Sequence, residues 1–221
     1  MDRSGWSLIR NVRGERLTYL PPNALSDLRR RMQELERAGI EGSVIEAGCA
    51  LGGSAVVLAA SKAKTRPMYV YDVFGTIPPP SQVDGEDVLR RYDEIADGRS
   101  NGIGGDIYYG YQENLLSKVT AVFARFGLPI DEHRVQLVKG LFQDTVRPVG
   151  PVAFAHIDGD WYESVKVCLE RIWPTLVVGG VLVIDDYDHW TGCRTAVDEF
   201  LLHRADCHIE RWSRLHLLKL R

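Results

Sequence analysis

Acidic side chains gather directly after an apolar run near the C-terminal end of the chain. The segment VIDDYDHW, residues 183–190, carries Asp185, Asp186 and Asp188 within four positions, and a histidine follows them. Two carboxylates about 4 Å apart repel each other by roughly 4 kcal/mol at an effective dielectric of 20. Such a cluster therefore needs solvent, a proton or a cation. Without a cation, Asp185 would cap the following helix and the other two carboxylates would be solvated.

A second acidic segment, AHIDGDWYES, indicates the same chemistry. It places Asp158 at the end of a buried-strand pattern, and the pair Asp185–Asp186 follows 27 residues later at the end of the next one. Neighbouring parallel strands lie about 4.8 Å apart, so carboxylates at two such ends can share one ion if the strands are neighbours. Hard oxygen ligands with room left for water and substrate suit Mg²⁺. The two segments together therefore favour a Mg²⁺ site over two solvated acidic patches.

A glycine turn joins the first predicted strand to the helix after it. In VIEAGCALGGSA the spacing is Glu46-x-Gly48-x-x-x-Gly52, with Gly53 and Ser54 next. Glycine lets a backbone bend tightly and approach a ligand, and the helix N-terminus offers unpaired N–H groups. The first acid can hold an ammonium group or an ordered water. The phosphate-binding lysine of a P-loop and the dinucleotide motif G-x-G-x-x-G are both absent.

An acid also ends the second predicted strand. Asp72 lies 24 residues after Gly48, and in nucleotide-binding sheets an acid at this position bonds ribose hydroxyls. Taken alone, the glycines could simply tighten a turn and Asp72 could simply cap its strand. The two features in this order and spacing favour a bound nucleotide-like ligand.

The glycine turn resembles the first motif of the class I S-adenosylmethionine-dependent methyltransferases. The resemblance implies that the turn faces the methionyl part of the cofactor, that the acid after the second strand takes the ribose hydroxyls, and that a run after the third strand flanks the adenine. The glycine motif would also tolerate a dehydrogenase. The residues that the resemblance assigns to the cofactor are Glu46, Ala47, Gly48, Ser54, Asp72, Gly140, Leu141 and Phe142.

Three further motifs, KGLFQDT, IDGDWYES and GGVLVIDDY, resemble in this order those of the macrocin O-methyltransferase family. These are metal-dependent enzymes that methylate sugar hydroxyls. The resemblance covers about residues 16–187 and implies that Asp158 also acts as the base. It further implies that the segment GERLTYL places Leu17 and Thr18 over the methionyl end. The metal ligands that it implies are Asp158, Asp185 and Asp186.

The segment over residues 75–107 departs from the family pattern and is longer than an ordinary connection. It lacks clear core periodicity, prolines at 78–80 stiffen one side, and glycines near residue 104 loosen the other. Tyr108, Tyr109 and Tyr111 follow it and offer flat surfaces for a sugar. We therefore expect a lid over the acceptor site, the alternative being a disordered surface insertion.

Strand and helix patterns alternate along the chain and must position these residues. A helix is expected over 23–39, before the first strand pattern. The alternation predicts a parallel sheet, and the last two patterns predict a hairpin. Ligands bind such sheets beyond the carboxyl ends of the strands, where every acid above lies. With the resemblance, the expectation is an α/β, Rossmann-like class I methyltransferase fold: a mostly parallel seven-stranded sheet with helices on both faces and a C-terminal β-hairpin. The strand patterns are SVIEAG, MYVYDVF, RVQLVKG, VAFAHID, GGVLVIDD, CHIERW and RLHLLKL.

Composition narrows the class of protein. A chain of 221 residues suits a single domain over 1–221, and a net charge of -3 gives no electrostatic footprint for nucleic acid or an anionic membrane. Four separated cysteines suggest reduced thiols, and without a signal peptide or apolar span the expected location is cytoplasmic. The expected partners are a small-molecule or oligosaccharide acceptor, with no nucleic acid and no membrane. The resemblance adds a homo-oligomer, a dimer.

The expected function is an S-adenosylmethionine-dependent O-methyltransferase that methylates a hydroxyl of a sugar or glycoside with the help of Mg²⁺. Asp158 is the expected base, and His189 is either a second catalytic base or a surface histidine at a helix start. His156 falls inside a strand pattern and is expected in the core. The alternatives are a nicotinamide-dependent oxidoreductase and a non-catalytic cofactor-binding module. The acceptor could be a methylmannose polysaccharide precursor or an antibiotic deoxysugar.

Overall fold

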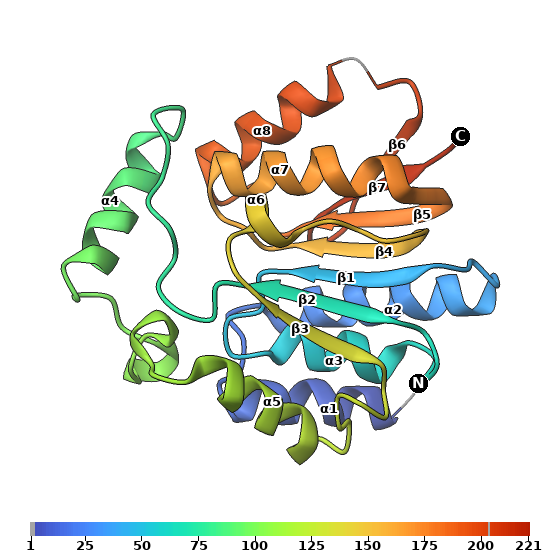
Figure 1. Cartoon of the computed structure of the whole chain (residues 1–221), viewed down its shortest axis with the longest axis horizontal. Coiled ribbons are helices and arrows are strands. Elements are labelled where there is room, and N and C mark those ends of the chain that lie inside the picture. The colour runs from blue at the N-terminus through green and yellow to red at the C-terminus, as the bar shows by residue number, and fades with distance from the viewer. Residues whose placement is uncertain (1–2, 203) are drawn as a thin grey trace.

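A seven-stranded sheet organises the molecule, in the order β3-β2-β1-β4-β5-β7-β6. The computed structural model describes residues 3–202 and 204–221. The first five strands pair in parallel, and β7 runs antiparallel between β5 and β6 (Figure 1). The predicted mostly parallel sheet with a C-terminal hairpin is confirmed. The strands are β1 (Ser43–Ala47), β2 (Met68–Asp72), β3 (Val135–Lys139), β4 (Val152–Ile157), β5 (Leu176–Ile184), β6 (Cys207–Arg211) and β7 (Leu215–Lys219).

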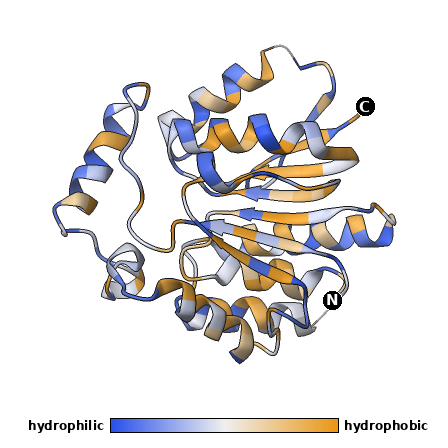
Figure 2. Cartoon of the chain, in the orientation of Figure 1, coloured by the Kyte–Doolittle hydropathy of each residue, from blue (hydrophilic) through white to orange (hydrophobic). Residues whose placement is uncertain are grey.

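Helices cover both faces of this sheet. Helices α1, α2, α3 and α5 bury their apolar side chains against one face, and α7 and α8 bury theirs against the other. The strands between them are largely apolar (Figure 2). Among the described residues, no helix has the length and apolar character needed to cross a membrane. The helices are α1 (Arg3–Gly14), α2 (Pro22–Arg37), α3 (Gly53–Ser61), α4 (Glu86–Ala96), α5 (Leu115–Arg125), α6 (Phe142–Thr145), α7 (Tyr162–Ile172) and α8 (Thr191–Leu201).

Three of these helices are absent from the expectations above, among them the four-residue α6 after β3. Helix α1 precedes α2, and α4 lies inside the segment 75–107, which therefore has secondary structure of its own. Only Val88 and Ile95 of α4 are buried, two helical turns apart. So few buried positions give little apolar periodicity. Figure 1 shows α4 standing away from the sheet, on the side where the parallel strands end.

The strands that carry the acids are neighbours. Ile157 at the end of β4 pairs with Ile184 at the end of β5, so Asp158 and Asp185 begin their loops side by side. On its other side β4 pairs with β1, where Ile157 lies opposite Ala47. The chain continues from β1 outward to β2 on one side and returns to β4 on the other, so the strand order reverses here. A doubly wound sheet binds its ligands at such a point.

Candidate active site

A cavity of about 310 Å³ opens at the carboxyl ends of the central strands. Its wall is made by the loops after β1, β3, β4 and β5, the end of β2, the N-terminal segment around residues 18–20 and parts of the segment 75–109. Most residues predicted for the site therefore face one space. The predicted residues in the lining are Thr18, Gly48, Ser54, Asp72, Leu141, Phe142, Asp158, Asp185, Asp186 and His189. Leu17, Glu46, Ala47 and Gly140 lie outside the lining.

Gly48 brings the loop after β1 against the loop after β4. Its φ is +93°, and a Cβ added there would lie 1.9 Å from the carbonyl oxygen of Asp158. Only glycine permits both this conformation and this approach. The motif E-x-G-x-x-x-G thus places the glycine turn after β1 in contact with the loop after β4 that carries Asp158.

The N-terminal segment packs on the start of α3. The backbone N–H of Gly53 donates to the carbonyl of Leu17 at 3.0 Å, and a Cβ on Gly53 would lie 2.6 Å from the same oxygen. Leu17 and Thr18 are both buried, and Thr18 lines the cavity. The segment GERLTYL therefore lies over the glycine turn.

Asp72 organises the loops after β1 and β2. Its Oδ2 accepts from the N–H groups of Cys49 (2.8 Å) and Ala50 (3.1 Å), and its Oδ1 accepts from Phe74 N–H (2.6 Å). Burial raises the pKa of Asp72, and the three N–H donors oppose that rise. Oδ1 accepts only one of these bonds and keeps a further lone pair, so the arrangement remains compatible with a ribose hydroxyl as donor.

A buried row of charged groups links the glycine turn to the acidic end. Glu46 accepts from the hydroxyl of Ser54 and lies 3.0 Å from His156 Nδ1. His156 Nε2 lies 3.5 Å from Asp185 Oδ1, which also accepts from Arg214 Nε at 2.6 Å. Burial by itself lowers the pKa of His156, but the two flanking carboxylates raise it well above its ordinary value. The two acids therefore favour the protonated form of His156, which lies between them.

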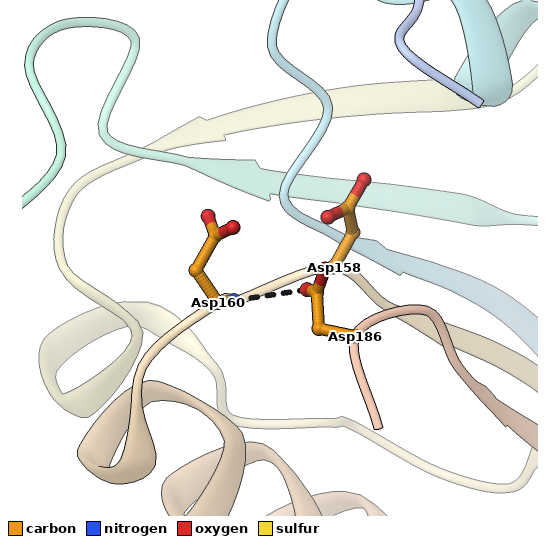
Figure 3. A group of neighbouring side chains, drawn as sticks. All are labelled: Asp158, Asp160 and Asp186. Carbon is orange, nitrogen blue, oxygen red and sulfur yellow. Dashed lines mark hydrogen bonds between the residues drawn. The ribbon is translucent and has the colours of Figure 1, made fainter. Parts of the chain in front are cut away.

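Three carboxylates converge at the cavity wall (Figure 3). Asp158, Asp160 and Asp186 each offer one oxygen, and these oxygens lie within 4.8 Å of one another. Asp186 is buried, whereas Asp158 and Asp160 are partly exposed. The backbone N–H of Asp160 donates to Asp186 Oδ2 at 3.1 Å. Such a set of hard oxygen donors fits a divalent cation such as Mg²⁺.

The cluster resists ionisation. Burial raises the pKa of Asp158 and of Asp186 well above the ordinary range, and neighbouring carboxylates raise both further. Burial also raises the pKa of Asp160 to about 6, opposed by a hydrogen bond of 2.9 Å from Trp190 Nε1. Asp185 differs. Burial opposes its ionisation, yet His156 and Arg214 outweigh that effect and lower its pKa.

Asp160 and Arg214 belong to the site but not to the residues predicted from the sequence. Asp160 is the second acid of IDGDWY, and its positive φ of 53° turns it back toward Asp186. The D-x-D spacing was a usable signal for it. Arg214 comes from the turn between β6 and β7, where no local pattern marks it. His189 is exposed at the cavity wall, and its backbone N–H donates to Asp186 O.

The segment after β2 forms a further part of the cavity wall. Tyr108 is buried, and its ring lies 4.4 Å from the ring of Tyr109 between centroids. Tyr111 points elsewhere, because its hydroxyl donates to the carbonyl of Ile95 at 2.6 Å. Two of the three tyrosines therefore line the cavity. The lining residues of this segment are Gly75, Ile77, Pro78, Arg91, Ile95, Tyr108 and Tyr109.

Residues 17–210 match the protein family described as Macrocin-O-methyltransferase (TylF). The chain is 34% identical over 168 residues to the 8-demethyl-8-(2,3-dimethoxy-alpha-L-rhamnosyl)-tetracenomycin-C 4'-O-methyltransferase of Streptomyces olivaceus, a match that covers 73% of this chain and 59% of the relative. It is 29% identical over 194 residues to the mycinamicin III 3''-O-methyltransferase of Micromonospora griseorubida, covering 83% of this chain and 69% of the relative. The chain thus spans about three fifths of the first relative's length.

Solved structures show the same fold. The O-methyltransferase NovP superposes with a TM-score of 0.77 at 22% identity, covering 93% of this chain and 83% of NovP. The calicheamicin methyltransferase CalS11 superposes with a TM-score of 0.63 at 18% identity, covering 99% and 93% of the two chains. The predicted class I methyltransferase fold is confirmed.

Proposed function

The chain belongs to the macrocin O-methyltransferase family, and on that premise we propose that it transfers the methyl group of S-adenosylmethionine to a hydroxyl of a sugar or glycoside. The observation that carries this proposal is the convergence of two features on one cavity. The glycine turn at Gly48 and the carboxylates of Asp158 and Asp186 line the same space, beside Asp72. That is the placement which methyl transfer to a metal-bound hydroxyl requires.

The cofactor end of the cavity lies over β1, β2 and β3. We propose that Thr18 and Gly48 flank the methionyl part, that Asp72 takes ribose hydroxyls, and that Leu141 and Phe142 flank the adenine. Bound S-adenosylmethionine supplies a methyl group that its sulfonium already activates. The protein must therefore mainly align the acceptor oxygen with that methyl group and exclude water, and alignment can contribute roughly 7–11 kcal/mol.

The acidic end of the cavity fits Mg²⁺. Asp158 and Asp186 belong both to the predicted ligands and to the converging group, so we propose these two as metal ligands. The third ligand is either Asp160, which lies in the group, or Asp185, which would have to leave Arg214. A bound divalent cation would stabilise the negative charge that develops on the acceptor oxygen.

The proposed base is Asp158, and Asp160 is its competitor. In the reaction the acceptor oxygen bonds to the methyl carbon as the carbon–sulfur bond breaks, while the carboxylate takes the hydroxyl proton. A base works best when its pKa lies near the working pH. Without a cation the pKa of Asp160 is raised to about 6, and a bound Mg²⁺ would lower it. Asp160 therefore competes through its place in the converging group, whereas the family resemblance favours Asp158. His189, exposed at the cavity wall, is the remaining candidate.

The relatives guide the choice of acceptor. Their names describe methyl transfer to a rhamnosyl-tetracenomycin and to mycinamicin III. We therefore place glycosides of deoxysugars first, and polysaccharide precursors such as methylmannose oligosaccharides second. A cytoplasmic location and a homodimer remain predictions. A nicotinamide-dependent oxidoreductase is disfavoured by the family membership.

Methyl transfer is tested with isotope-labelled S-adenosylmethionine. The protein is incubated with a panel of monosaccharides, oligosaccharides and deoxysugar glycosides, and products are read by mass spectrometry with Mg²⁺ and with excess chelator. We expect a mass gain on one acceptor that chelator abolishes and Mg²⁺ restores. Full transfer in chelator would refute the metal role, and cofactor binding without transfer to any acceptor would favour a non-catalytic module.

The two candidate bases are separated by substitution. Asp158→Asn and Asp160→Asn are each expected to leave S-adenosylhomocysteine binding intact in calorimetry. Because both carboxylates are also candidates for the metal, rates are compared at saturating Mg²⁺, where the variant that removes the base should still be slower by about 10²–10⁴-fold. His189→Gln tests the remaining candidate at the same cavity wall and should lose far less. If both Asp variants keep wild-type rates, neither carboxylate is the base.

A further inference from the structure

The helices that follow the two acidic loops begin in the same way. Helix α7 follows Trp161 and α8 follows Trp190, and neither tryptophan can cap the helix with its side chain. A helix leaves its first N–H groups without intrahelical partners, and buried ones need acceptors. In this chain carboxylates from one distant segment, residues 84–87, supply acceptors to both helices.

Asp84 is the more deeply placed of these two carboxylates, with 6% of its surface exposed. Its Oδ1 accepts from the N–H of Tyr162, the first residue of α7, at 2.8 Å. Its Oδ2 accepts from Ser81 N–H (2.8 Å) and from the Ser81 hydroxyl (2.9 Å). At the start of α8, a Cβ on Gly192 would lie 1.9 Å from Asp84 Oδ1. The carboxylate therefore lies between the first residues of α7 and α8.

Two further contacts join the same segment to the acidic loops. Asp87 accepts from the N–H of Thr191 at 3.0 Å and from the Thr191 hydroxyl. The indole N–H of Trp161 donates to the carbonyl of Pro78 at 2.9 Å. The stretch 78–87 is thus docked on both helix starts, and Pro78 itself lines the cavity.

The loop that Asp84 supports carries two of the three converging carboxylates. Tyr162, whose N–H it binds, lies only two residues after Asp160 and four after Asp158. Asp160 also has a left-handed backbone, with φ of +53°. Non-glycine residues persist in that region only when their surroundings hold them there. The hydrogen bond from Tyr162 N–H to Asp84 fixes the C-terminal end of this strained loop.

We propose that Asp84 is a positioning residue for the metal-binding loop. By binding the first amide of α7 it holds Asp158 and Asp160 at the separation that one divalent cation needs. The inference rests on the proposed function, since it assumes that these carboxylates bind a metal. Partners behind metal ligands are typically worth 10–100-fold in metal affinity. Asp84 itself lies outside the cavity lining.

The test measures Mn²⁺ affinity by electron paramagnetic resonance, with S-adenosylhomocysteine affinity measured by calorimetry on the same samples. Asp84→Ala is expected to weaken Mn²⁺ binding by about 10–100-fold and to leave S-adenosylhomocysteine binding unchanged, because the cofactor side lies over β1, β2 and β3. Asp84→Asn keeps an acceptor for Tyr162 N–H and should restore most of the Mn²⁺ affinity. Glu86→Gln, at an exposed acid two residues away, is the control and should match the wild type.

Gly192→Ala tests the same contact by a change in α8 instead of in Asp84. The new methyl group would lie 1.9 Å from Asp84 Oδ1 and 3.0 Å from the backbone nitrogen of Tyr162, so it disrupts the hydrogen bond between them without removing the carboxylate. The same selective loss of Mn²⁺ affinity is expected. This variant decides the matter if Asp84→Ala fails to fold.

Unchanged Mn²⁺ affinity in these variants overturns the inference, as does a parallel loss of both affinities, which would indicate a merely structural role. A wild-type protein that binds S-adenosylhomocysteine but no Mn²⁺ refutes the proposed metal site first, and the inference with it. That failure is distinguishable because it is seen before any variant is compared.

Discussion

At the scale of single residues, His156 shows how partners from distant segments decide a role. It lies on β4, between Glu46 of β1 and Asp185 after β5, and both His156 and Glu46 are fully buried. The sequence pattern predicts only that His156 is in the core. Its raised pKa follows from the pairing of three strands, which no local pattern reveals.

Removing the His156 side chain should destabilise the protein strongly. In His156→Leu the buried Glu46 loses its cation, and an uncompensated buried charge costs about 3–5 kcal/mol. For a chain of this length that corresponds to a fall in Tm of about 6–20 °C. The double variant Glu46→Gln/His156→Leu removes both charges and should recover part of the loss. A Tm of His156→Leu within about 2 °C of the wild type would contradict a charged His156.

The candidate site shows which residues a sequence can and cannot reveal. Asp158 and Asp186 are predictable because each follows an apolar strand pattern, and parallel strands end at one edge. Asp160 needed a backbone with positive φ to turn back toward Asp186, and residue type alone does not predict that conformation. Arg214 reaches Asp185 only because β7 inserts beside β5.

At the scale of elements, the strands were more predictable than the helices. The five parallel strands are mainly apolar, and acids lie at the ends of three of them, β2, β4 and β5. Helix α4 has too few buried positions to show a period. Its segment is docked through residues 78–87, so the lid hypothesis now concerns the part that follows, from α4 to Tyr108. That closure remains a proposal.

The contact between the loops after β1 and β4 predicts a sharp difference between two glycines. Gly48→Ala should abolish S-adenosylhomocysteine binding in calorimetry and lower the Tm, because the new Cβ meets the carbonyl of Asp158 at 1.9 Å. Gly127→Ala, with φ of +73° and nothing within 4 Å of its Cβ, is the matched control. It bears only the backbone cost, about 1–2 kcal/mol, and should bind the cofactor product normally. Equal binding by both variants would contradict the close approach at Gly48.

At the scale of the whole molecule, the strand order concentrates negative charge at one edge. The order places β1, β4 and β5 side by side, so carboxylates from the loops after β4 and β5 meet where the sheet reverses direction. Arg214 and His156 compensate Asp185. Asp158, Asp160 and Asp186 instead have raised pKa values. The fold thus holds these acids together at a cost in stability that a proton or a cation relieves.

This cost predicts how pH and metal act together on thermal stability. A carboxyl whose pKa is raised on folding contributes stability that is present below its unfolded pKa and lost as pH rises through its folded pKa. Asp160, with a pKa of about 6, should therefore make the metal-free protein less stable at pH 7.5 than at pH 5. In chelator, Asp160→Asn should weaken that pH dependence.

Mg²⁺ should reverse the loss, because it takes the place of the missing protons. At one hundred times its Kd it would add about 2.7 kcal/mol, or about 5–11 °C in Tm, at pH 7.5. At pH 5 protons compete for the same oxygens, so the increase should be smaller. Differential scanning calorimetry gives the Tm under the four conditions, at each pH value with Mg²⁺ and with chelator. An equal effect of Mg²⁺ at both pH values would show that the cation does not bind these carboxylates.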